Sequence, residues 1–292
     1  MPPIWPVRQA NSRAARGWAG AMVDLSDTLV LIKGGGDLAT GVALRLFHAG
    51  FPIVITELPQ PLMVRRTVSL GEAVNLGEAR VEDVLAVRVE DTAAVRRVLG
   101  RRCVGRRIPV LVDPQAECRH ELRPTIVVDA IMAKRNLGTS MADAPWVVAL
   151  GPGFCAGADC HVVIETNRGH DLGRPIYQGC AEPNTGVPGN VGGRTHERVL
   201  RAPAVGVMEN CADIGQYVAA GQVVAVVDGH PVWAEIDGVL RGLLRSGAQV
   251  SAKDKIGDVD PRAEPAHCYR VSDKALAVGG GVLEAVMGFL TG

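Results

Sequence analysis

A glycine-rich stretch with the spacing of a phosphate-binding loop stands near the start of the sequence, in "LVLIKGGGDLATG", residues 29–41. Gly34, Gly36 and Ala39 match G-x-G-x-x-A, in which the first glycine makes a tight turn and the second lets a pyrophosphate approach the backbone. A helix that starts here would offer free N–H groups and the positive end of its dipole to an anion. The stretch predicts nucleotide or phosphate binding, and a bare turn between two packed elements is the alternative.

Acidic residues near this loop bear on which ligand it would take. Glu57 ends the next expected strand, about 20 residues further on, where an acidic side chain ordinarily binds ribose hydroxyls. This carboxylate would repel a 2′-phosphate, so NAD-like or adenosine ligands are expected rather than NADP. Asp37 would also repel a phosphate unless it caps the helix or holds a metal ion. The expected cofactor contacts of this first loop are Gly34, Gly35, Gly36, Asp37, Ala39, Thr40 and Glu57.

A second polar and glycine-rich cluster, "GPGFCAGADCHVVIETNRGHDLGRPIYQG", occupies residues 151–179. It follows an apolar run, and ligands of open α/β sheets collect at the carboxyl ends of strands. Arg168 and His170 could clamp an anion or transfer a proton, and we expect both to face the same cleft as residues 34–36. The alternative is a structured surface loop in which Arg168 pairs with an acid of the same segment. The expected cofactor contacts here are Gly151, Gly153, Phe154, Glu165, Thr166, Arg168, Gly169 and His170.

The cysteines leave several kinds of chemistry open. There are 7 of them, scattered and without a CxxC pair, which suits a reducing cytosol better than a disulfide framework, so a cytoplasmic location is expected. Cys155, Cys160 and His161 could ligate a metal, but C-x4-C-H is not a standard zinc spacing and no metal site is predicted. Cys155 could instead be a nucleophile or a sulfur carrier. The catalytic residues stay unassigned, with His170, Lys134 and Cys155 as candidates.

Alternating strands and helices are expected to position these loops. Apolar runs at 29–33 and 53–56 flank a helical pattern that ends at Gly50, which makes a strand–helix–strand unit with parallel strands. The fold class is therefore α/β, with a Rossmann-like, doubly wound parallel sheet. Further strands are expected at 85–89, 108–112, 126–128 and 146–150, and a further helix at 91–99.

A duplicated pattern marks a second kind of structure. The segments 214–229 and 246–261, "IGQYVAAGQVVAVVDG" and "SGAQVSAKDKIGDVDP", align with each other. Repeated short strands with glycine turns indicate a small all-β module of two interlocked halves, similar to the barrel-sandwich hybrid of biotinyl and lipoyl carriers. Those carriers have a lysine at the hairpin between the halves. Here the turn is "DGHP", residues 228–231, so no covalent biotin or lipoate is expected.

Four parts of the chain are expected. They are a poorly ordered leader at 1–26, a Rossmann-like cofactor-binding domain at 27–198, the β module at 199–263 and a C-terminal segment at 264–292. The last part carries a triple glycine, 279–281, before an apolar helix. We expect this glycine run to pack on the Rossmann-like domain, with a second anion site as the alternative.

Charge and hydropathy argue against two classes of partner. Lys plus Arg and Asp plus Glu both number 31, so the formal net charge is +0. A neutral chain has no general attraction for nucleic acid or for an anionic membrane. We also expect no stretch to reach the roughly 18 apolar residues of a membrane span. Neither nucleic acid nor a membrane is therefore expected as a partner.

Several motifs together resemble the YqeB family, whose members are described as selenium-dependent molybdenum hydroxylase system or molybdenum cofactor biosynthesis proteins. The resemblance runs from about residue 28 to residue 286, and the Rossmann part is similar to that of XdhC, an accessory protein of xanthine dehydrogenase. The motifs are "LVLIKGGGDLATGVALRLFHAGF", "DAIMAKRN", "GPGF", "VIETNRGHDLGR", "NTGVPG", "RVLRAP" and "KIGDVDPR" followed by "SDKALAVGGGVLEA".

This resemblance implies a cytoplasmic accessory or maturation factor for a molybdenum hydroxylase. It implies binding of molybdenum cofactor (molybdopterin) or a related nucleotide, with the hydroxylase as the client partner; a homo-oligomer is left open. The first glycine loop would be residues 34–41. Lys134, Arg135 and Asn136 of "AKRN" would face the same cleft.

Two other functions compete with this one. An NAD-dependent oxidoreductase would need an acid or base near the nicotinamide, and His170 or Lys134 could supply it. A non-catalytic adaptor would instead use the β module to dock a client enzyme. The sequence alone leaves all three open.

Overall fold

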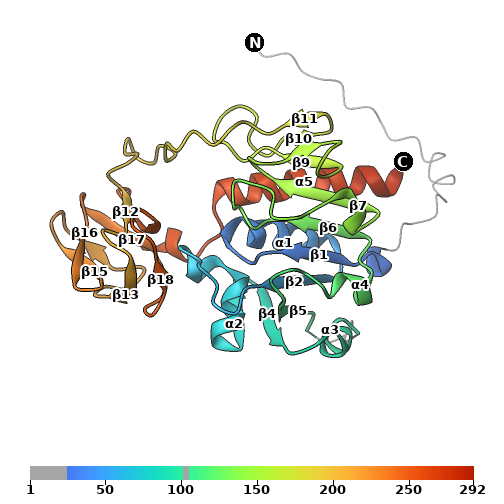
Figure 1. The fold of residues 1–292 in the computed structure, drawn as a ribbon, viewed down its shortest axis with the longest axis horizontal. Coiled ribbons are helices and arrows are strands. Elements are labelled where there is room, and N and C mark those ends of the chain that lie inside the picture. Colours follow the sequence, from blue (N-terminus) through green and yellow to red (C-terminus); the bar gives the residue numbers. More distant parts are fainter. Residues whose placement is uncertain (1–24, 101–104) are drawn as a thin grey trace, which may run out of the picture.

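A nine-stranded sheet forms the centre of the larger part of the protein (Figure 1). The computed structural model describes residues 25–100 and 105–292, so nearly all of the predicted leader 1–26 lies outside the described residues. The strand order is β10-β9-β7-β6-β1-β2-β5-β4-β3. The strands are β1 Val30–Lys33, β2 Ile53–Glu57, β3 Glu78–Val81, β4 Val84–Val89, β5 Ile108–Val112, β6 Ile126–Asp129, β7 Trp146–Leu150, β9 Val162–Ile164 and β10 Pro175–Ile176.

Most neighbouring strands of this sheet are parallel. Every pairing from β9 through β4 is parallel, and only β3 and β10, at the two edges, run antiparallel to their neighbours. The chain passes from β1 to β2 on one side, whereas β6 lies against β1 on the other. The predicted α/β class with a largely parallel sheet is confirmed. The carboxyl ends of the parallel strands meet at one edge, which brings the loops after β1, β2, β6 and β7 together.

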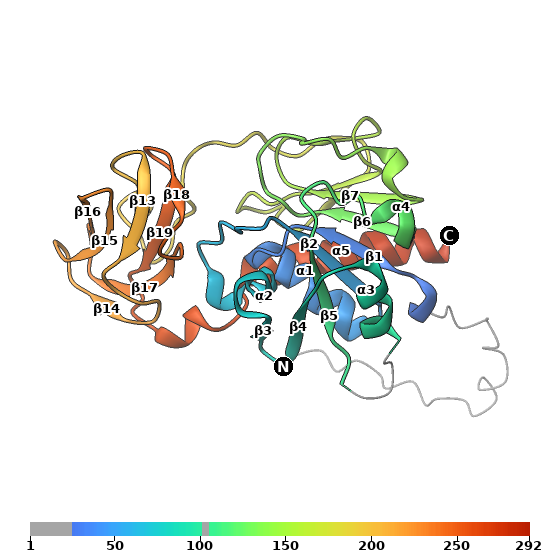
Figure 2. The same ribbon diagram turned by 60° about the horizontal axis from the view of Figure 1, so that its bottom comes forward.

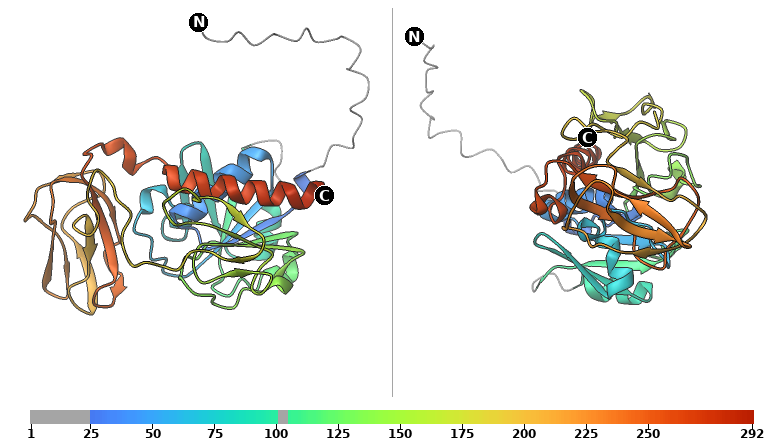
Figure 3. Two further views of the ribbon diagram at one scale, coloured as in Figure 1. Left: turned by 90° about the horizontal axis from the view of Figure 1, so that it is seen from above. Right: turned by 90° about the vertical axis from the view of Figure 1, so that its left-hand side faces the viewer.

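Helices cover both faces of the sheet. Alternate residues of β1 separate the two cores: Val30 and Ile32 pack with α1 and α5, and Leu31 packs on the opposite side with Val95 of α3. Figure 3 shows α5 running along one face. The helices are α1 Asp37–Ala49, α2 Ala73–Leu76, α3 Thr92–Leu99, α4 Arg119–Leu122 and α5 Asp273–Thr291, with short 3-10 turns η1 Leu25–Asp27, η2 Arg66–Val68, η3 Leu70–Glu72, η4 Met141–Asp143 and η5 Pro265–Cys268.

Glycines let α1 and α5 cross at very close range. A Cβ on Gly41 would collide with the backbone of Ala275, and one on Gly279 would collide with the backbone of Gly41. The triple glycine 279–281 lies inside α5, not before a helix as the sequence suggested, so its amides belong to the helix. Its role is the predicted packing, and the helix interior offers no second anion site.

The C-terminal helix also corrects the expectation about apolar length. The segment Pro265–Thr291 is long and apolar enough to cross a membrane by length and composition. Core helices of soluble proteins have the same character, and α5 buries Val278, Val282 and Val286 in the core shared with α1. In the described structure, 39% of an apolar stretch of this segment is buried.

The β module consists of two four-stranded antiparallel sheets with a core of their own. Their orders are β12-β19-β17-β14 and β16-β15-β13-β18, and the described strands form no closed barrel. The two repeats exchange strands: β14 of the first joins the sheet of β19, and β18 of the second joins that of β15. The strands are β12 Val199–Arg201, β13 Gly206–Asn210, β14 Tyr217–Val218, β15 Val223–Val227, β16 His230–Trp233, β17 Gly238–Leu243, β18 Gln249–Val250 and β19 Lys255–Asp260.

The segment around η2 holds the β module against the α/β part, beside which it lies in Figure 2. The amide of Leu243 donates to the carbonyl oxygen of Val64 at 2.8 Å, and Arg66 Nε donates to the carbonyl oxygen of Leu243 at 2.8 Å. Arg245 forms an ion pair with Glu72. The module is thus attached by backbone pairing as well as by charge.

A disulfide joins Cys155 and Cys180, in the short strands β8 Cys155–Ala156 and β11 Gly179–Cys180. The sequence favoured reduced cysteines and offered Cys155 as a nucleophile or sulfur carrier. That assignment is wrong for the structure described, because the sulfur of Cys155 is bonded and carries no thiol. The scattered spacing hid the pair, since the two residues meet only after the chain folds back through β9 and β10.

Candidate functional site

A cavity of about 640 Å³ opens at the carboxyl edge of the sheet. Its walls come from the loops after β1, β2, β5 and β6, from the segment 58–65, and from the first residue of β19 in the β module. Ligands of open α/β sheets bind at this edge, where strand order reverses. The polar and charged residues that line it are Lys33, Asp37, Thr56, Glu57, Arg65, Ser69, Asp113, Gln115, Lys134 and Lys255.

The first glycine loop lies at this cavity. Gly34 has a φ of 87°, which only glycine adopts readily, and this turn leads the chain from β1 into α1. Gly36 lines the cavity and is the N-cap of α1, where no side chain caps the helix. A Cβ built on Gly36 would meet no atom within 4 Å. The helix therefore presents its N-terminus to open space in the cavity.

Gly35, Ala39 and Thr40, which were also expected to contact the ligand, have structural roles. Ala39 and Thr40 are fully buried, and Thr40 Oγ1 accepts a hydrogen bond from the amide of Leu70 at 2.9 Å. Gly35 packs against Gly71, and its amide donates to Glu57 Oε1 at 2.7 Å. These residues shape the loop and do not line the cavity.

Glu57 lines the cavity, but backbone amides already occupy its carboxylate. Besides Gly35, the amide of Leu58 donates to Glu57 Oε2 at 2.8 Å. Burial raises the pKa of Glu57, and these two hydrogen bonds oppose that rise. The carboxylate fixes the glycine loop to β2, and whether it also binds a ribose stays a prediction.

Arg65 is a buried cation close to the start of α1. Its side chain is 8% exposed and lines the cavity. Nη2 donates to the carbonyl oxygens of His267 and Arg270, at 2.9 and 3.3 Å. Nη1 lies 3.6 Å from Asp37 Oδ2, yet Nε and Nη1 have no hydrogen-bond partner among the described residues. Burial, followed by the like charge of Arg241, lowers the pKa of Arg65.

The loop after β6 forms another wall. Met132 and Lys134 line the cavity with φ angles of 61° and 62°, which non-glycine residues rarely adopt. Asn136 points its amide into the loop instead: Oδ1 accepts from the amides of Gly138 and Thr139, both at 2.8 Å. Of the "AKRN" residues, Lys134 alone lines the cavity, while the backbone of Arg135 packs beside Gly153.

At the floor of the cavity, three buried polar side chains join β1 and β6. Lys33 Nζ donates to Thr139 Oγ1 at 2.5 Å, and the Thr139 hydroxyl donates to Asp129 Oδ2 at 2.6 Å. Lys33 and Asp129 are the last residues of the two strands. None of these three residues is among the contacts expected from the sequence.

The second glycine-rich cluster does not line this cavity. Gly151 lies against the side chain of Thr166, and Phe154 is buried in the core on the α3 side of the sheet. Glu165 is 3% exposed, and its two oxygens accept from the amides of Asn167 at 2.6 Å and Glu182 at 2.7 Å. Its carboxylate ties together the loop that follows β9.

Arg168 and His170 also lie outside the cavity lining, together with Gly169. Arg168 makes a two-point ion pair with Asp273, the first residue of α5, at 2.8 and 2.9 Å. Arg168 thus forms a structural ion pair, as the alternative interpretation proposed, but its partner belongs to α5 and not to the same segment. The hydrogen bonds from Arg168 hold the pKa of Asp273 well below its usual range.

Cys160 and His161 have structural surroundings as well. Cys160 is fully buried, and burial raises the pKa of its thiol to about 12. His161 stacks on Trp146 with ring centroids 4.9 Å apart, and its Nδ1 accepts from the amide of Val147 at 3.0 Å. Burial lowers the pKa of His161. Within residues 25–100 and 105–292, no group of three or more His, Cys, Asp or Glu side chains could hold a metal ion.

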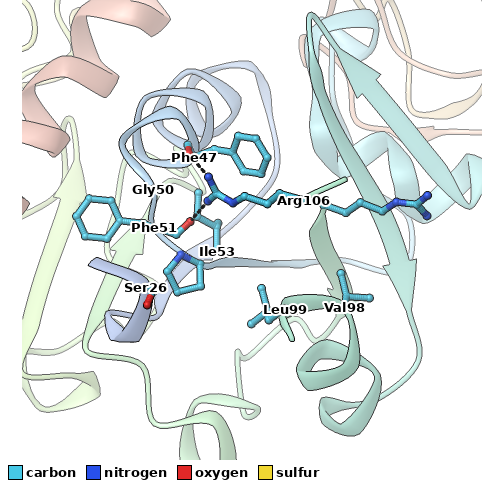
Figure 4. A pocket seen from close by; sticks show the side chains of 10 residues that line it. Ser26, Phe47, Gly50, Phe51, Ile53, Val98, Leu99 and Arg106 are labelled. Carbon is cyan, nitrogen blue, oxygen red and sulfur yellow. Dashed lines mark hydrogen bonds between the residues drawn. The ribbon is translucent and has the colours of Figure 1, made fainter. Parts of the chain in front are cut away.

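A smaller cavity of about 180 Å³ lies near the C-terminal end of α1 (Figure 4). Arg106 reaches across it and donates to the carbonyl oxygens of Phe47 and Phe51 at 2.8 and 2.7 Å. Its guanidinium also lies 4.2 Å above the ring of Phe47. A cation at the negative end of a helix dipole stabilises the helix. The arginine that lines this cavity therefore has a structural role.

Sequence reasoning missed the cavity residues that come from distant segments. Arg65 lies in an irregular stretch without a motif, and Lys255 reaches the cavity from the β module. Lys33 could have been found, because it is a lysine at the end of an apolar strand, directly before the glycine loop. Its partner Thr139 had no such signal.

Comparison with known proteins gives one informative match. The chain is 52% identical over 259 residues to "Uncharacterized protein YqeB" of Escherichia coli strain K12, and the match covers 89% of this chain and 47% of YqeB. The chain thus spans about half the length of that relative. No family model matches, and no solved structure gives a significant match. The match supports the YqeB resemblance, whereas the link to molybdenum hydroxylases and XdhC rests on the motifs alone.

Proposed function

We propose that the protein binds a phosphate-bearing molecule of cofactor size in the 640 Å³ cavity, with the phosphate between the N-terminus of α1 and Arg65. The observation that carries this proposal is the uncapped N-terminus of α1, which is open to the cavity at Gly36. Beside it lies the guanidinium of Arg65, which is more than nine-tenths buried and has two nitrogens, Nε and Nη1, without a hydrogen-bond partner among the described residues. An anion at this position would accept from both the guanidinium and the amides that begin α1.

The energetics favour an anion over an empty pocket. A buried donor without an acceptor costs about 1–3 kcal/mol, and more when it is charged. Asp37 offsets part of the positive charge, but it lies 3.6 Å away and accepts no hydrogen bond from Arg65. A phosphate can accept from a guanidinium at two points and from helix N–H groups at the same time.

The topology supports the same placement. A Rossmann-like architecture is part of the proposal, and it differs in order from the common one because β5 lies between β2 and β4. The reversal between β2 and β6 on either side of β1 is retained, and Gly34 packs there against Ala130 and Ile131. Ligands bind at such reversals in open sheets.

We further propose that the cargo is molybdenum cofactor or a related nucleotide, handled for a client molybdenum hydroxylase. This step rests on the motif resemblance to the YqeB family and on similarity to XdhC. The chemistry fits, because molybdopterin carries a phosphate and polar pterin edges, and the cavity combines an anion site with Lys33, Glu57 and Asp113. On this proposal the cofactor is cargo, and the protein's residues hold and orient it.

An NAD-dependent oxidoreductase is the second candidate. The observation that favours it is Lys33, which lines the cavity and carries a proton that could be transferred. The acid or base expected from the sequence was His170 or Lys134. His170 does not line the cavity, so an acid or base role would fall to a lysine. A change in NADH absorbance with added substrates would support this candidate over cofactor handling.

The β module has a proposed part in the same site. Its exchanged repeats suit a barrel-sandwich hybrid arrangement, and Lys255 at the start of β19 lines the cavity. We therefore place the module as one wall of the ligand site. Capture of a client by the module alone would favour the adaptor function instead.

The test is to identify what the protein carries. The full chain is purified, denatured, and its released small molecules are measured by mass spectrometry beside the Gly36→Val variant. A phosphate-bearing pterin or nucleotide that is present with the wild type and depleted with the variant supports the proposal. NAD supports the second candidate, and equal recovery from both proteins contradicts a site at α1.

A further inference from the structure

Lys33 is a buried cation whose hydrogen bonds are only partly used. Its side chain is 8% exposed, yet it lines the cavity. Lys33 Nζ donates to Thr139 Oγ1 at 2.5 Å and lies 3.8 Å from Asp129 Oδ2. The ammonium has three N–H groups, and the structure gives it one hydrogen-bond acceptor among the described residues.

The direction of the hydrogen bonds in this cluster is fixed. The hydroxyl of Thr139 has one proton, which it donates to Asp129 Oδ2 at 2.6 Å. Its oxygen must therefore accept from Lys33, which keeps the lysine as a donor. The remaining N–H groups of Lys33 are available to an acceptor in the cavity. Asp129 compensates the charge of Lys33, but buried N–H groups without acceptors are costly, so a ligand oxygen at this point would be stabilising.

The cluster is held in place from outside. Asp129 Oδ1 accepts from the amide of Ile131 at 3.1 Å. Asn136 clamps the backbone of Thr139 from both sides: its Oδ1 accepts from the Thr139 amide and its Nδ2 donates to the Thr139 carbonyl, each at 2.8 Å. Asn136 Nδ2 also donates to Asp159 at 3.0 Å. These hydrogen bonds fix the position of Thr139. Binding groups whose positions are fixed in advance in this way are preorganised for their ligand.

We propose that Lys33 is the second recognition point of the cavity, where it binds a carbonyl-type oxygen of the ligand while the phosphate lies at α1. Thr139 and Asp129 are positioning residues that hold the amine toward the cavity. This inference rests on the proposed function, since it concerns the other end of the same ligand. It narrows the ligand class to phosphate-bearing molecules that also carry such an oxygen.

Pyridoxal 5′-phosphate is a probe with both groups. If its phosphate binds at α1 and its aldehyde lies at Lys33, the ammonium first releases one proton to solvent. The free amine nitrogen then attacks the aldehyde carbon, water leaves, and an imine forms. Borohydride then delivers hydride to the imine carbon and leaves a stable secondary amine. Peptide mass spectrometry of the full chain locates the adduct. We expect Lys33 to be labelled ahead of the exposed cavity lysines Lys134 and Lys255.

Thr139 supplies matched variants. Without the hydroxyl, Lys33 loses the acceptor that holds its Nζ and can move toward Asp129 Oδ2, now 3.8 Å away. Thr139→Val should therefore reduce the adduct at Lys33 by about tenfold, which corresponds to about 1.4 kcal/mol. Thr139→Ser keeps the hydroxyl and should restore the labelling. Labelling of Lys134 and Lys255 is the internal control and should not change in either variant.

Pyridoxine 5′-phosphate, which lacks the aldehyde, separates the two proposals. Suppose that Gly36→Val abolishes the binding of pyridoxine 5′-phosphate, but pyridoxal 5′-phosphate labels lysines other than Lys33. This result overturns the role of Lys33 and still supports the phosphate site. Equal labelling of Lys33 in Thr139→Val and the wild type overturns the positioning role. Absence of binding of both compounds to the wild type ends the phosphate site and this inference together.

Discussion

The guanidinium of Arg65 lies 3.6 Å from the carboxylate of Asp37, which is the first residue of α1. This relationship resolves the conflict that the sequence posed, in which an acid beside a phosphate-binding loop would repel its ligand. The buried arginine compensates the charge of Asp37, and two of its nitrogens have no hydrogen-bond acceptor within the part of the chain that the structure describes. The start of α1 is therefore a site with an excess of donors.

Arg168→Ala should leave ligand affinity unchanged and lower stability slightly. The sequence suggested the reverse, but Arg168 lies outside the cavity lining and pairs with Asp273. Both side chains are substantially exposed, so the loss should be about 0.2–1 kcal/mol. Chemical denaturation and ligand titration on the same samples check this. A selective loss of affinity would return Arg168 to the binding site.

The pair should also make stability fall in acid. Because Arg168 lowers the pKa of Asp273 below its ordinary value of 3.8, the contribution of the pair is present above that pH. It is lost as the pH falls toward the lowered value. Arg168→Ala should therefore flatten this acid limb of the stability curve.

Glu57→Gln should change how stability depends on pH in the mildly acidic range. Burial raises the folded-state pKa of Glu57 above 4.5, so the wild type loses stability as the pH rises from 4.5 through that raised value. Glutamine does not titrate, and its carbonyl oxygen can accept only part of what the two carboxylate oxygens accept from Gly35 and Leu58. Unfolding curves at several pH values measure the effect, and an unchanged slope would contradict it.

Alkylation of the native protein should distinguish its cysteines. Cys118, Cys160 and Cys268 are buried, and burial raises the pKa of each thiol, whereas Cys211 is exposed. We expect iodoacetamide to modify Cys211 before these three, and to modify Cys155 only after reduction. Reduction should also lower the free energy of unfolding by about 2–4 kcal/mol. Modification of Cys155 without reduction would contradict the disulfide.

The β module should carry no covalent cofactor. The turn between β15 and β16 contains Asp228 and Gly229 but no lysine. The intact mass of the purified full chain should therefore equal that of the bare polypeptide. A mass increase equal to a biotinyl or lipoyl group would refute this prediction.

Regular periodicity made the sheet predictable. The strands β5 and β7 begin and end at the residues expected from their apolar runs, and Asp91 caps α3 through the amide of Ala94 as the helical pattern implies. The edge strands β3 and β10 were missed because neither contains an apolar run: β3 alternates exposed and buried residues, and β10 has only two residues.

The site was predictable only where a local motif marks it. Gly34 and Gly36 depend on a turn and a helix start, which sequence records within a few residues. Arg65 lies beside Asp37, 28 positions away, and Lys33 on the cavity lining is held by Thr139, 106 positions away. Such contacts produce no periodic pattern in the sequence. The second binding site was therefore predicted at the dense polar cluster 151–179, which does not line the cavity.

The substitution Gly36→Val gives the cleanest perturbation of the proposed phosphate position. A side chain there would enter open space, so the fold should persist, whereas a Cβ on Gly35 would lie 2.6 Å from the Cα of Gly71. Gly169→Val is the matched control, because Gly169 also has open space for a side chain but does not line the cavity. Both variants should unfold at the wild-type temperature, and Gly35→Val should be destabilised.

Calorimetric titration of the full chain with adenine nucleotides and with molybdopterin, for the wild type, Gly36→Val and Gly169→Val, tests the central claim most directly. The account predicts that at least one of these phosphate-bearing compounds binds the wild type and Gly169→Val with equal affinity. Gly36→Val should bind it at least about tenfold more weakly, a loss of about 1.4 kcal/mol. Unchanged affinity in Gly36→Val, or binding that Gly169→Val abolishes instead, would contradict a phosphate site at the start of α1.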